Sequence, residues 1–349
     1  MSLKRALGPF DATMVVVGGI IGAGIFINPY IVAQRLDSAP LVLSAWIAGG
    51  VVALCGALTF AELGSLRPEA GGHYAYLRDA YHPLAGFLYG WGLLLIIESG
   101  AIAAVAITFA QYALRLVGNE GAATIPLAIA AIVVVTAVNY FGVKPGSRLL
   151  NVFVVLKVAA LAVLIVAGLF LPARQPTVGN RVGAAVDSAV GATVEAGNAV
   201  GEAVGLQAPE EEGSGTPLFI VAFGAALIPV MFSYGGWQNA NYVAEEITDP
   251  QRNVPRALIL GTSIVVATYV AVNFVYLQAL GHAGLEGTLT PAADTARRVF
   301  GSAGDRFIAG AIAISTFGFL DLTVLAPSRV YYAMARDGVF FQSVARLHP

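Results

Sequence analysis

Two clusters of glycine lie inside long apolar segments, where they could expose backbone groups for binding. The first, GGIIGAG at 18–24, places four glycines within seven residues. The second, SYGGW at 233–237, places two adjacent glycines in a later apolar segment. Each glycine costs about 1 kcal/mol relative to alanine in a helix interior. Both segments are therefore predicted to interrupt a helix.

An interrupted helix inside a membrane has a defined binding chemistry. Unwinding frees N–H and C=O groups that lipid cannot satisfy, so the break must line a cavity or bind a ligand. N–H groups at a half-helix N-terminus suit a carboxylate, and freed carbonyls suit an ammonium group. The two together predict a site for the zwitterionic part of an amino acid. Close packing through small residues is the alternative, but two matched breaks favour a transport site.

The elements that hold these glycines are predicted to be membrane-spanning helices. The chain is 57% hydrophobic and 11% charged, whereas a soluble domain has about 25% charged residues. A spanning helix needs about 20 mostly apolar residues. The segments that qualify are 11–34, 41–64, 84–116, 124–142, 148–171, 218–245, 256–280 and 303–327. We therefore predict an all-α integral membrane protein with one transmembrane domain of eight spans over 1–349.

Charge predicts the orientation of these spans and excludes several partners. With the N-terminus in the cytoplasm, the inner segments hold eleven Lys and Arg residues and the outer segments seven, as the positive-inside rule requires. Segment 177–215 is rich in Gly, Ala and Val and is predicted to be an extracytoplasmic low-complexity insertion. The net charge of -2 argues against nucleic acid. Cys55 is the single cysteine, so no cysteine-based metal site, and no cofactor, is predicted.

Three ionisable residues fall inside the predicted spans. Lys157 lies about ten residues into the fifth span. A central lysine costs roughly 2.5 to 3.5 kcal/mol on insertion, so we expect it to have a buried partner. Glu98 in the third span and Asp321 in the eighth are the candidates, and either could instead carry a coupling proton.

Three segments resemble the amino acid–polyamine–organocation (APC) superfamily. They are GGIIGAGIFINP at 18–29, FAELGSLRPEAGGHYAYLRDAYHP at 60–83 and FSYGGWQNANYVAEEITDPQRNVPRA at 232–257. The last is most similar to the L-type amino acid transporter branch. The resemblance implies a LeuT-type fold of two inverted five-helix repeats, with helices 1 and 6 discontinuous. Such folds usually continue with further helices, so the chain is expected to be truncated after helix 8.

The resemblance also implies roles for individual residues. The substrate carboxylate would meet the backbone N–H groups of Ala23 and Gly24, and the ammonium group the carbonyls of Ile20, Phe232 and Gly235. Lys157 would occupy the place where sodium-coupled relatives bind sodium, which implies sodium-independent transport. The predicted substrate-binding residues are Ile20, Gly22, Ala23, Gly24, Phe232, Ser233 and Gly235, and the predicted gating or coupling residues are Phe232, Lys157, Glu98 and Asp321.

The function implied is a permease, not an enzyme, that moves amino acids across the cell (inner) membrane by alternating access. No acidic residue falls within the two breaks, which favours neutral L-amino acids. The alternatives are a cationic amino acid or polyamine antiporter, and a membrane sensor that binds without transport. Animal L-type relatives bind a heavy chain through a cysteine in the loop that corresponds to 117–124. This loop has none, so no disulfide-linked heavy chain is expected.

Overall fold

A computed structural model of the chain describes residues 3–119, 123–171 and 216–346. The predicted insertion at 177–215 lies outside the described residues. The described part is helical, and its one β-type contact is an isolated bridge between Leu7 and Ile247. The first half contains α1 (Pro9–Ile20), α2 (Gly24–Ile27), α3 (Pro29–Ala33), α4 (Ala39–Leu66), α5 (His73–Ala80), α6 (Pro83–Gly92), the π-helix η1 (Leu93–Glu98), α7 (Ser99–Leu116), α8 (Thr124–Tyr140) and α9 (Val143–Phe170).

The second half begins after the undescribed segment and again contains a broken helix. Its elements are α11 (Thr216–Tyr234), α12 (Asn239–Tyr242), η2 (Ala244–Glu246), α13 (Pro250–Glu286), α14 (Pro291–Phe300), η3 (Gly301–Ala303), α15 (Gly304–Leu325), α16 (Ser328–Arg336) and η4 (Gln342–Ala345). Proline stands in the first turn of α1, α4, α6 and α13, where the missing N–H group costs no helical hydrogen bond.

Helices occupy all eight ranges that hydropathy predicted. Within the described residues, five helical stretches are long and apolar enough to cross a membrane: Ala39–Leu66, Pro83–Leu116, Val143–Phe170, Pro250–Glu286 and Pro291–Arg336. Shorter apolar helices cover Pro9–Ile20, Thr124–Tyr140 and Phe219–Tyr234. α13 leaves helical geometry at Gly281, which has φ 70° and ψ 174°, directly after the predicted end of this span at residue 280.

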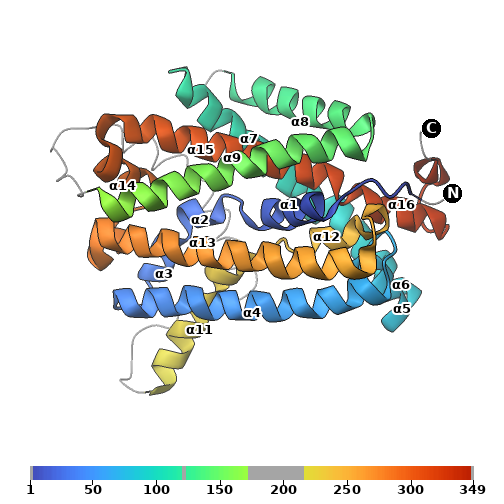
Figure 1. The fold of residues 1–349 in the computed structure, drawn as a ribbon, viewed down its shortest axis with the longest axis horizontal. Coiled ribbons are helices and arrows are strands. Elements are labelled where there is room, and N and C mark those ends of the chain that lie inside the picture. Colours follow the sequence, from blue (N-terminus) through green and yellow to red (C-terminus); the bar gives the residue numbers. More distant parts are fainter. Residues whose placement is uncertain (1–2, 120–122, 172–215, 347–349) are drawn as a thin grey trace.

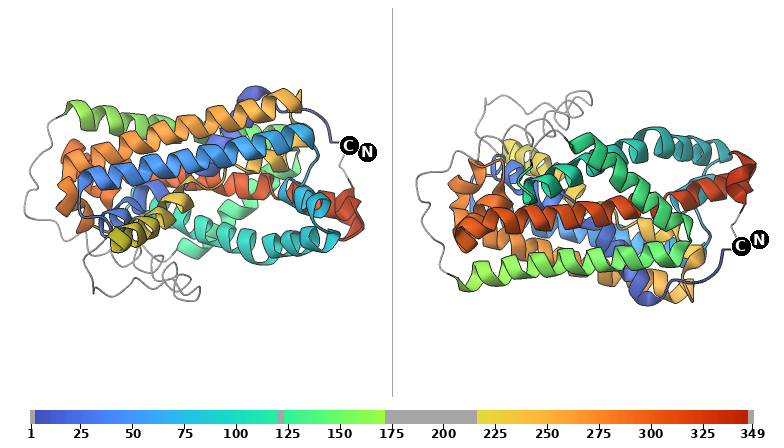
Figure 2. Two further views of the ribbon diagram at one scale, coloured as in Figure 1. Left: turned by 90° about the horizontal axis from the view of Figure 1, so that it is seen from below. Right: turned by 90° about the horizontal axis from the view of Figure 1, so that it is seen from above.

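The long helices lie side by side, with α1 between α9 and α13 (Figure 1). α4 packs along α13, and α15 packs against both α7 and α9. α11 runs obliquely to this bundle at one end, as the views in Figure 2 also show. The core of buried side chains extends from α1 and α4 to α13 and α15. The centre of the molecule is thus the region around the C-terminal end of α1.

Glycines on α4 bring this helix against the second broken helix on both sides of its break. A methyl group added at Gly49 would lie 2.3 Å from Val230 of α11. One added at Gly64 would lie 2.6 Å from Asn241 of α12. Small residues at these positions allow the helices to approach closely. α4 therefore acts as a support that positions both halves of the broken helix.

The end of the bundle that carries the N-terminal segment, α5 and α16 is held closed by polar contacts (Figure 1). The N–H groups of Ala6 and Leu7 donate to the carbonyl of Glu246 at 2.8 and 2.9 Å. Arg329 of α16 donates two hydrogen bonds to the carboxylate of Glu246, from Nε at 2.7 Å and from Nη2 at 3.1 Å. Because both partners are largely buried, this bidentate pair fixes α16 to the end of the broken helix.

Candidate functional site

The first break is a sharp turn directly after α1. Ile21 has φ -76° and ψ 90°, and the N–H of Gly22 donates to the carbonyl of Ile20 at 2.9 Å. This is an inverse γ-turn. Helical structure resumes at Gly24, and Asn28 also has helical angles, so α2 and α3 form one nearly continuous segment. The predicted interruption of the first helix is confirmed.

The second break follows α11. The N–H of Gly235 donates to the carbonyl of Phe232 at 3.3 Å, and the chain then turns at Gly236, which has φ 110°. The side chain of Asn239 donates to the carbonyl of Gly236 at 3.0 Å and so begins α12. Glycine is required at Gly236 because other residues rarely adopt this positive φ. The predicted interruption of the sixth helix is also confirmed.

The two breaks are in direct contact. A methyl group added at Gly236 would lie 2.0 Å from the carbonyl oxygen of Gly19, and one added at Gly19 would lie 2.5 Å from that of Gly236. A methyl group at Gly24 would lie 3.2 Å from the Cα atom of Ser233. The two backbones therefore cross where each helix is interrupted. Close packing and binding are compatible here, because Gly24 makes one of these close approaches and its N–H group has no hydrogen-bond partner among the described residues.

Free peptide groups remain at this crossing. In the described part of the chain, the N–H groups of Ala23 and Gly24 and the carbonyl of Gly235 have no hydrogen-bond partner. Ala23 and Gly24 are half-buried, and Gly235 is exposed. The carbonyl of Ile20 differs, because it already accepts from Gly22 and from the Tyr269 hydroxyl, the latter at 3.0 Å. The unpaired groups comprise donors on one break and an acceptor on the other, as a zwitterion requires.

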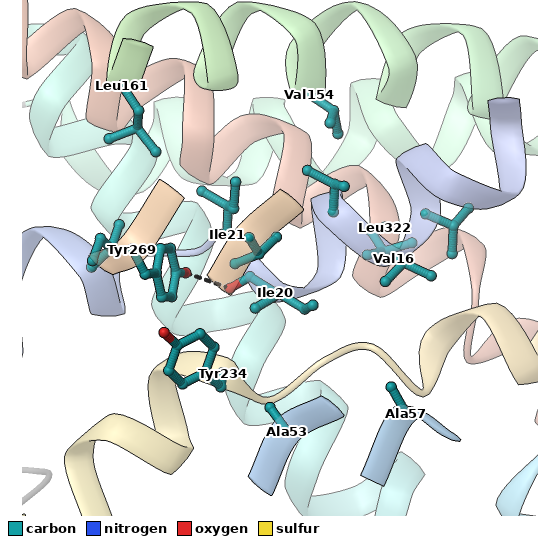
Figure 3. Packing of buried hydrophobic residues seen from close by; sticks show 14 of the residues in the cluster. Val16, Ile20, Ile21, Ala53, Ala57, Val154, Leu161, Tyr234, Tyr269 and Leu322 are labelled. Carbon is teal, nitrogen blue, oxygen red and sulfur yellow. Dashed lines mark hydrogen bonds between the residues drawn. The ribbon is translucent and has the colours of Figure 1, made fainter. Parts of the chain in front are cut away.

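Two tyrosine side chains of α13 donate hydrogen bonds to carbonyls on either side of the first break. The Tyr269 hydroxyl donates to the carbonyl of Ile20 (Figure 3), and the Tyr276 hydroxyl donates to that of Ile25 at 3.4 Å. Both tyrosines are fully buried. They stand seven residues apart, which places them on one face of the helix. That spacing is visible in the sequence, but neither tyrosine is among the predicted site residues.

Lys157 is fully buried, and its partners are backbone carbonyls. Its Nζ atom donates to the carbonyl oxygens of Gly18 at 3.2 Å and Ile21 at 2.7 Å. Among the described residues it forms no ion pair with Glu98 or Asp321, so neither of the two expected carboxylates is its partner. A cation at this position complements the negative end of the α1 dipole. The lysine thus ties α9 to the C-terminal end of the first half-helix.

The other predicted coupling residues lie apart from Lys157. Glu98 ends the π-helix η1, an irregularity often found at functional sites, and its Oε2 atom is buried without a partner in the described residues. Asp321 is fully buried in α15 and accepts from Asn139 at 2.6 Å. The structure therefore does not gather Lys157, Glu98 and Asp321 into one cluster.

Phe232 and Ser233 are adjacent but differ in environment. The Phe232 side chain is 79% exposed in the described structure, whereas Ser233 is 3% exposed. The Ser233 hydroxyl donates to the carbonyl of Pro229 at 2.8 Å and accepts from Asn28 at 2.8 Å. Its hydrogen-bonding capacity is thus used within the protein. Phe232 has the exposure that a gating side chain needs, and its gating role stays a prediction.

Asn28 links the two broken helices and was not singled out from the sequence. Its Nδ2 atom donates to the carbonyl of Pro229 at 3.1 Å and to Ser233 Oγ at 2.8 Å. Pro229 has no N–H group, so the carbonyl of Ala225 one turn earlier loses its helical donor, and the Arg35 guanidinium donates to it instead. Asn28 adds a second bond between the two broken helices by donating to the carbonyl of Pro229 itself. A single polar residue has no periodicity, and so only the fold reveals this cross-link.

We expect Asn28→Ala to lower amino acid uptake by at least about five-fold, because the two lost hydrogen bonds together contribute about 1–3 kcal/mol. Uptake into proteoliposomes, normalised to reconstituted protein, measures this effect. Gln34→Ala is the matched control, because Gln34 also makes an amide-to-carbonyl bond, to Glu286, but at an exposed position. Equal uptake by the two variants would show that the cross-link is dispensable.

His73 begins α5 and packs among aromatic rings near the closed end of the bundle. Its ring lies 4.5 Å from that of Phe60 and stacks on Tyr89 at 5.4 Å, between ring centroids. Burial lowers the pKa of His73 from 6.5 to about 4, because desolvation disfavours the charged ring. His73 is therefore neutral at physiological pH.

This burial predicts a pH-dependent stability. Between pH 6.5 and 4 the unfolded chain binds a proton at His73 and the folded chain does not, so this contribution to stability is complete above pH 6.5 and is lost as the pH falls. We expect the thermal unfolding midpoint in detergent to fall between pH 7 and 5, and to fall less in His73→Gln. An identical pH slope in both proteins would contradict the assignment.

The fold and the paired breaks define a class: a helical membrane transporter of the LeuT type, with discontinuous helices 1 and 6. A solved structure of MHP1, a nucleobase-cation-symport-1 family transporter, is similar in fold, with a TM-score of 0.56, 14% identity, and coverage of 98% of this chain and 69% of that one. A family model described as amino acid permease matches residues 7–348. The chain belongs to the amino acid permease family.

Relatives within the family are named as amino acid transporters. The b(0,+)-type amino acid transporter 1 of Homo sapiens is 30% identical over 357 residues, which cover all of this chain and 67% of that protein. The large neutral amino acids transporter small subunit 2 of Mus musculus is 31% identical over 353 residues, and the chain spans 61% of its length. The predicted family, its L-type branch and the LeuT-type fold are thereby confirmed.

Proposed function

We propose that this chain is a secondary transporter that moves neutral L-amino acids across the cell membrane by alternating access. The observation that carries the proposal is the set of unpaired peptide groups where the breaks cross. Donors at Ala23 and Gly24 and an acceptor at Gly235 match a carboxylate and an ammonium group. The names of the relatives support the same substrate class.

Transport is proposed to be independent of sodium. The Lys157 ammonium group binds the carbonyls of Gly18 and Ile21, and carbonyl oxygens of this kind would otherwise suit a hard cation. A fixed positive charge at this point also repels a second cation. No coupling sodium ion is therefore needed to hold the end of α1.

The test is uptake of radiolabelled leucine into proteoliposomes that contain the full chain. We expect uptake to be stimulated by unlabelled leucine inside, to persist when choline replaces sodium, and to be inhibited by glutamine more than by lysine. Dominant inhibition by lysine, arginine or a polyamine would identify a cationic antiporter instead. Saturable binding without flux would identify a sensor and would contradict the transport proposal.

We also propose eight membrane spans with the N-terminus in the cytoplasm. Arg67, Arg78, Arg329 and Arg336 are assigned to this inner side, which fits the positive-inside rule. Because Cys55 is the single cysteine, a Cys55→Ala protein gives a cysteine-free background. Lys4→Cys should then be protected from an impermeant thiol reagent in intact cells, and Asn119→Cys should be labelled. The reverse pattern would overturn the orientation.

We propose that the chain forms no disulfide bond with a partner protein. Cys55 lies within α4, where its carbonyl accepts from Thr59 at 3.0 Å, in the middle of a predicted span and away from either membrane surface. A covalent bond to an extracellular protein would require a cysteine outside the membrane. The chain should therefore migrate identically on denaturing gels with and without reductant, and a reductant-sensitive complex in native membranes would refute this.

A further inference from the structure

A carboxylic acid and an amide form a buried pair away from the breaks, between α8 and α15. Asp321 is 0% exposed, and its Oδ1 atom accepts from Asn139 Nδ2 at 2.6 Å. The neighbouring residue Leu320 packs with small and aliphatic side chains of α7 and α8. A carboxyl group therefore lies in an apolar layer with a single hydrogen-bond donor.

The hydrogen bonds of this pair do not balance if Asp321 is ionised. The second hydrogen of Asn139 Nδ2 is used by the carbonyl of Val135 at 2.8 Å. Asp321 Oδ2 and Asn139 Oδ1 are both buried and have no donor among the described residues. Two buried acceptors of this pair would thus remain unsatisfied, one of them on a charged group, which is costly in an apolar environment.

No cation among the described residues compensates this charge. α15 packs against α1, α7, α8, α9, α14, η3 and α16. The two arginines of α16 are bound to carboxylates, Arg329 to Glu246 and Arg336 to Glu245. On α9, Lys144 and Arg148 are exposed, and Lys157 is bound to the carbonyls of α1. The remaining charged groups on these helices either have other partners or lie far from Asp321. Asp11 accepts from Asn151, Asp294 and Asp305 bind Arg297, and Arg298 donates to the Ala279 carbonyl. Arg115 and Arg306 lie at the outer ends of α7 and α15, opposite the end that holds Asp321.

We propose that Asp321 retains a proton and forms a closed acid–amide pair with Asn139. One proton on Oδ2 turns that atom into a donor to Asn139 Oδ1, so a single proton satisfies both orphan acceptors. The proton comes from water during folding and no other bond changes. The neutral pair links α8 to α15 through two reciprocal hydrogen bonds. Because Asp321 is fully buried, the proton is held throughout the cycle and is not a coupling proton.

This site is independent of which substrate the protein carries, and it makes a specific prediction for one isosteric change. In Asp321→Asn, the new amide can donate to Asn139 Oδ1 and accept from Asn139 Nδ2, as the protonated acid does. We expect its thermal unfolding midpoint in detergent to stay within about 2 °C of the wild type. The pH profile of uptake should be unchanged.

Asn139→Asp is the contrasting variant. It places two carboxyl groups side by side, and these cannot both ionise at low cost. Because the unfolded chain releases the Asp321 proton above about pH 4, the contribution of Asp321 to the unfolding midpoint of the wild type should fall as the pH rises from 5 to 8. The fall should be at least as steep in Asn139→Asp, and Asp321→Asn should not show it. This readout depends on protonation and does not require transport.

Difference infrared spectroscopy tests the proton directly. The wild type at neutral pH should show a protonated-carboxyl carbonyl band that is missing from Asp321→Asn. Absence of that band, or a midpoint of Asp321→Asn lowered by well over 5 °C, would show that Asp321 is an anion. Loss of the pH dependence of uptake in Asp321→Asn would show that the proton is exchanged, which also overturns the proposal.

Discussion

Gly236→Ala is expected to reduce uptake at least ten-fold. The residue has φ 110°, and an added Cβ atom would lie 2.0 Å from the backbone oxygen of Gly19. Left-handed backbone costs a residue with a side chain about 1–2 kcal/mol, and forcing apart a packed contact adds about 1–3 kcal/mol. Each 1.4 kcal/mol corresponds to a factor of ten. Leucine uptake per reconstituted molecule is the measurement.

Gly224→Ala is the matched control for this substitution. Gly224 lies in α11, on the same broken helix, and an added Cβ atom there meets no other atom within 4 Å. Its uptake should remain close to that of the wild type. Elution as a single peak in detergent will separate loss of transport from loss of folding. If Gly236→Ala folds and transports as well as Gly224→Ala does, the crossing of the two breaks is not essential.

The positions of the breaks were predictable because their cause is local. Glycine weakens a helix wherever it lies, so GGIIGAG at 18–24 and SYGGW at 233–237 marked the interruptions without knowledge of the fold. The apolar helices were predictable for the same reason, since length and apolar composition are properties of one segment. The structure adds that the two breaks touch, through Gly19 and Gly236, which no local signal specifies.

Partners across helices were not predictable. Lys157 has the buried partner that the sequence predicts, but the partner is neither candidate carboxylate, Glu98 or Asp321: it is the pair of carbonyls of Gly18 and Ile21. Which groups the Lys157 side chain can reach depends on how α9 is rotated about its axis relative to α1, and the hydropathy of a segment does not specify that rotation. The link from Asn28 to Ser233 was missed because it joins residues 205 positions apart. Polar groups in membranes are satisfied by the fold as a whole, so their partners emerge only with the tertiary structure.

Lys157→Met is expected to lower uptake by at least ten-fold while sodium remains without effect on the wild type. Methionine keeps the length and flexibility of the side chain but cannot donate, so the carbonyls of Gly18 and Ile21 lose their shared donor. A buried group left unsatisfied costs about 1–3 kcal/mol. Because these carbonyls end the half-helix next to the proposed substrate site, the loss acts on the binding geometry. Leucine uptake in sodium and in choline buffers measures both parts.

Lys144→Met controls for the general effect of removing a lysine from α9. Lys144 is exposed near the start of the same helix, and this variant should transport as the wild type does. Lys157→Arg keeps the charge but enlarges the head group, so it separates charge from fit: uptake between that of Lys157→Met and the wild type would show that charge at this point is part of the requirement. Unimpaired uptake by Lys157→Met would mean that the end of α1 holds its geometry without the lysine. The sodium-independent mechanism would then lose its structural basis, because a positive charge fixed on those carbonyls is what replaces the ion.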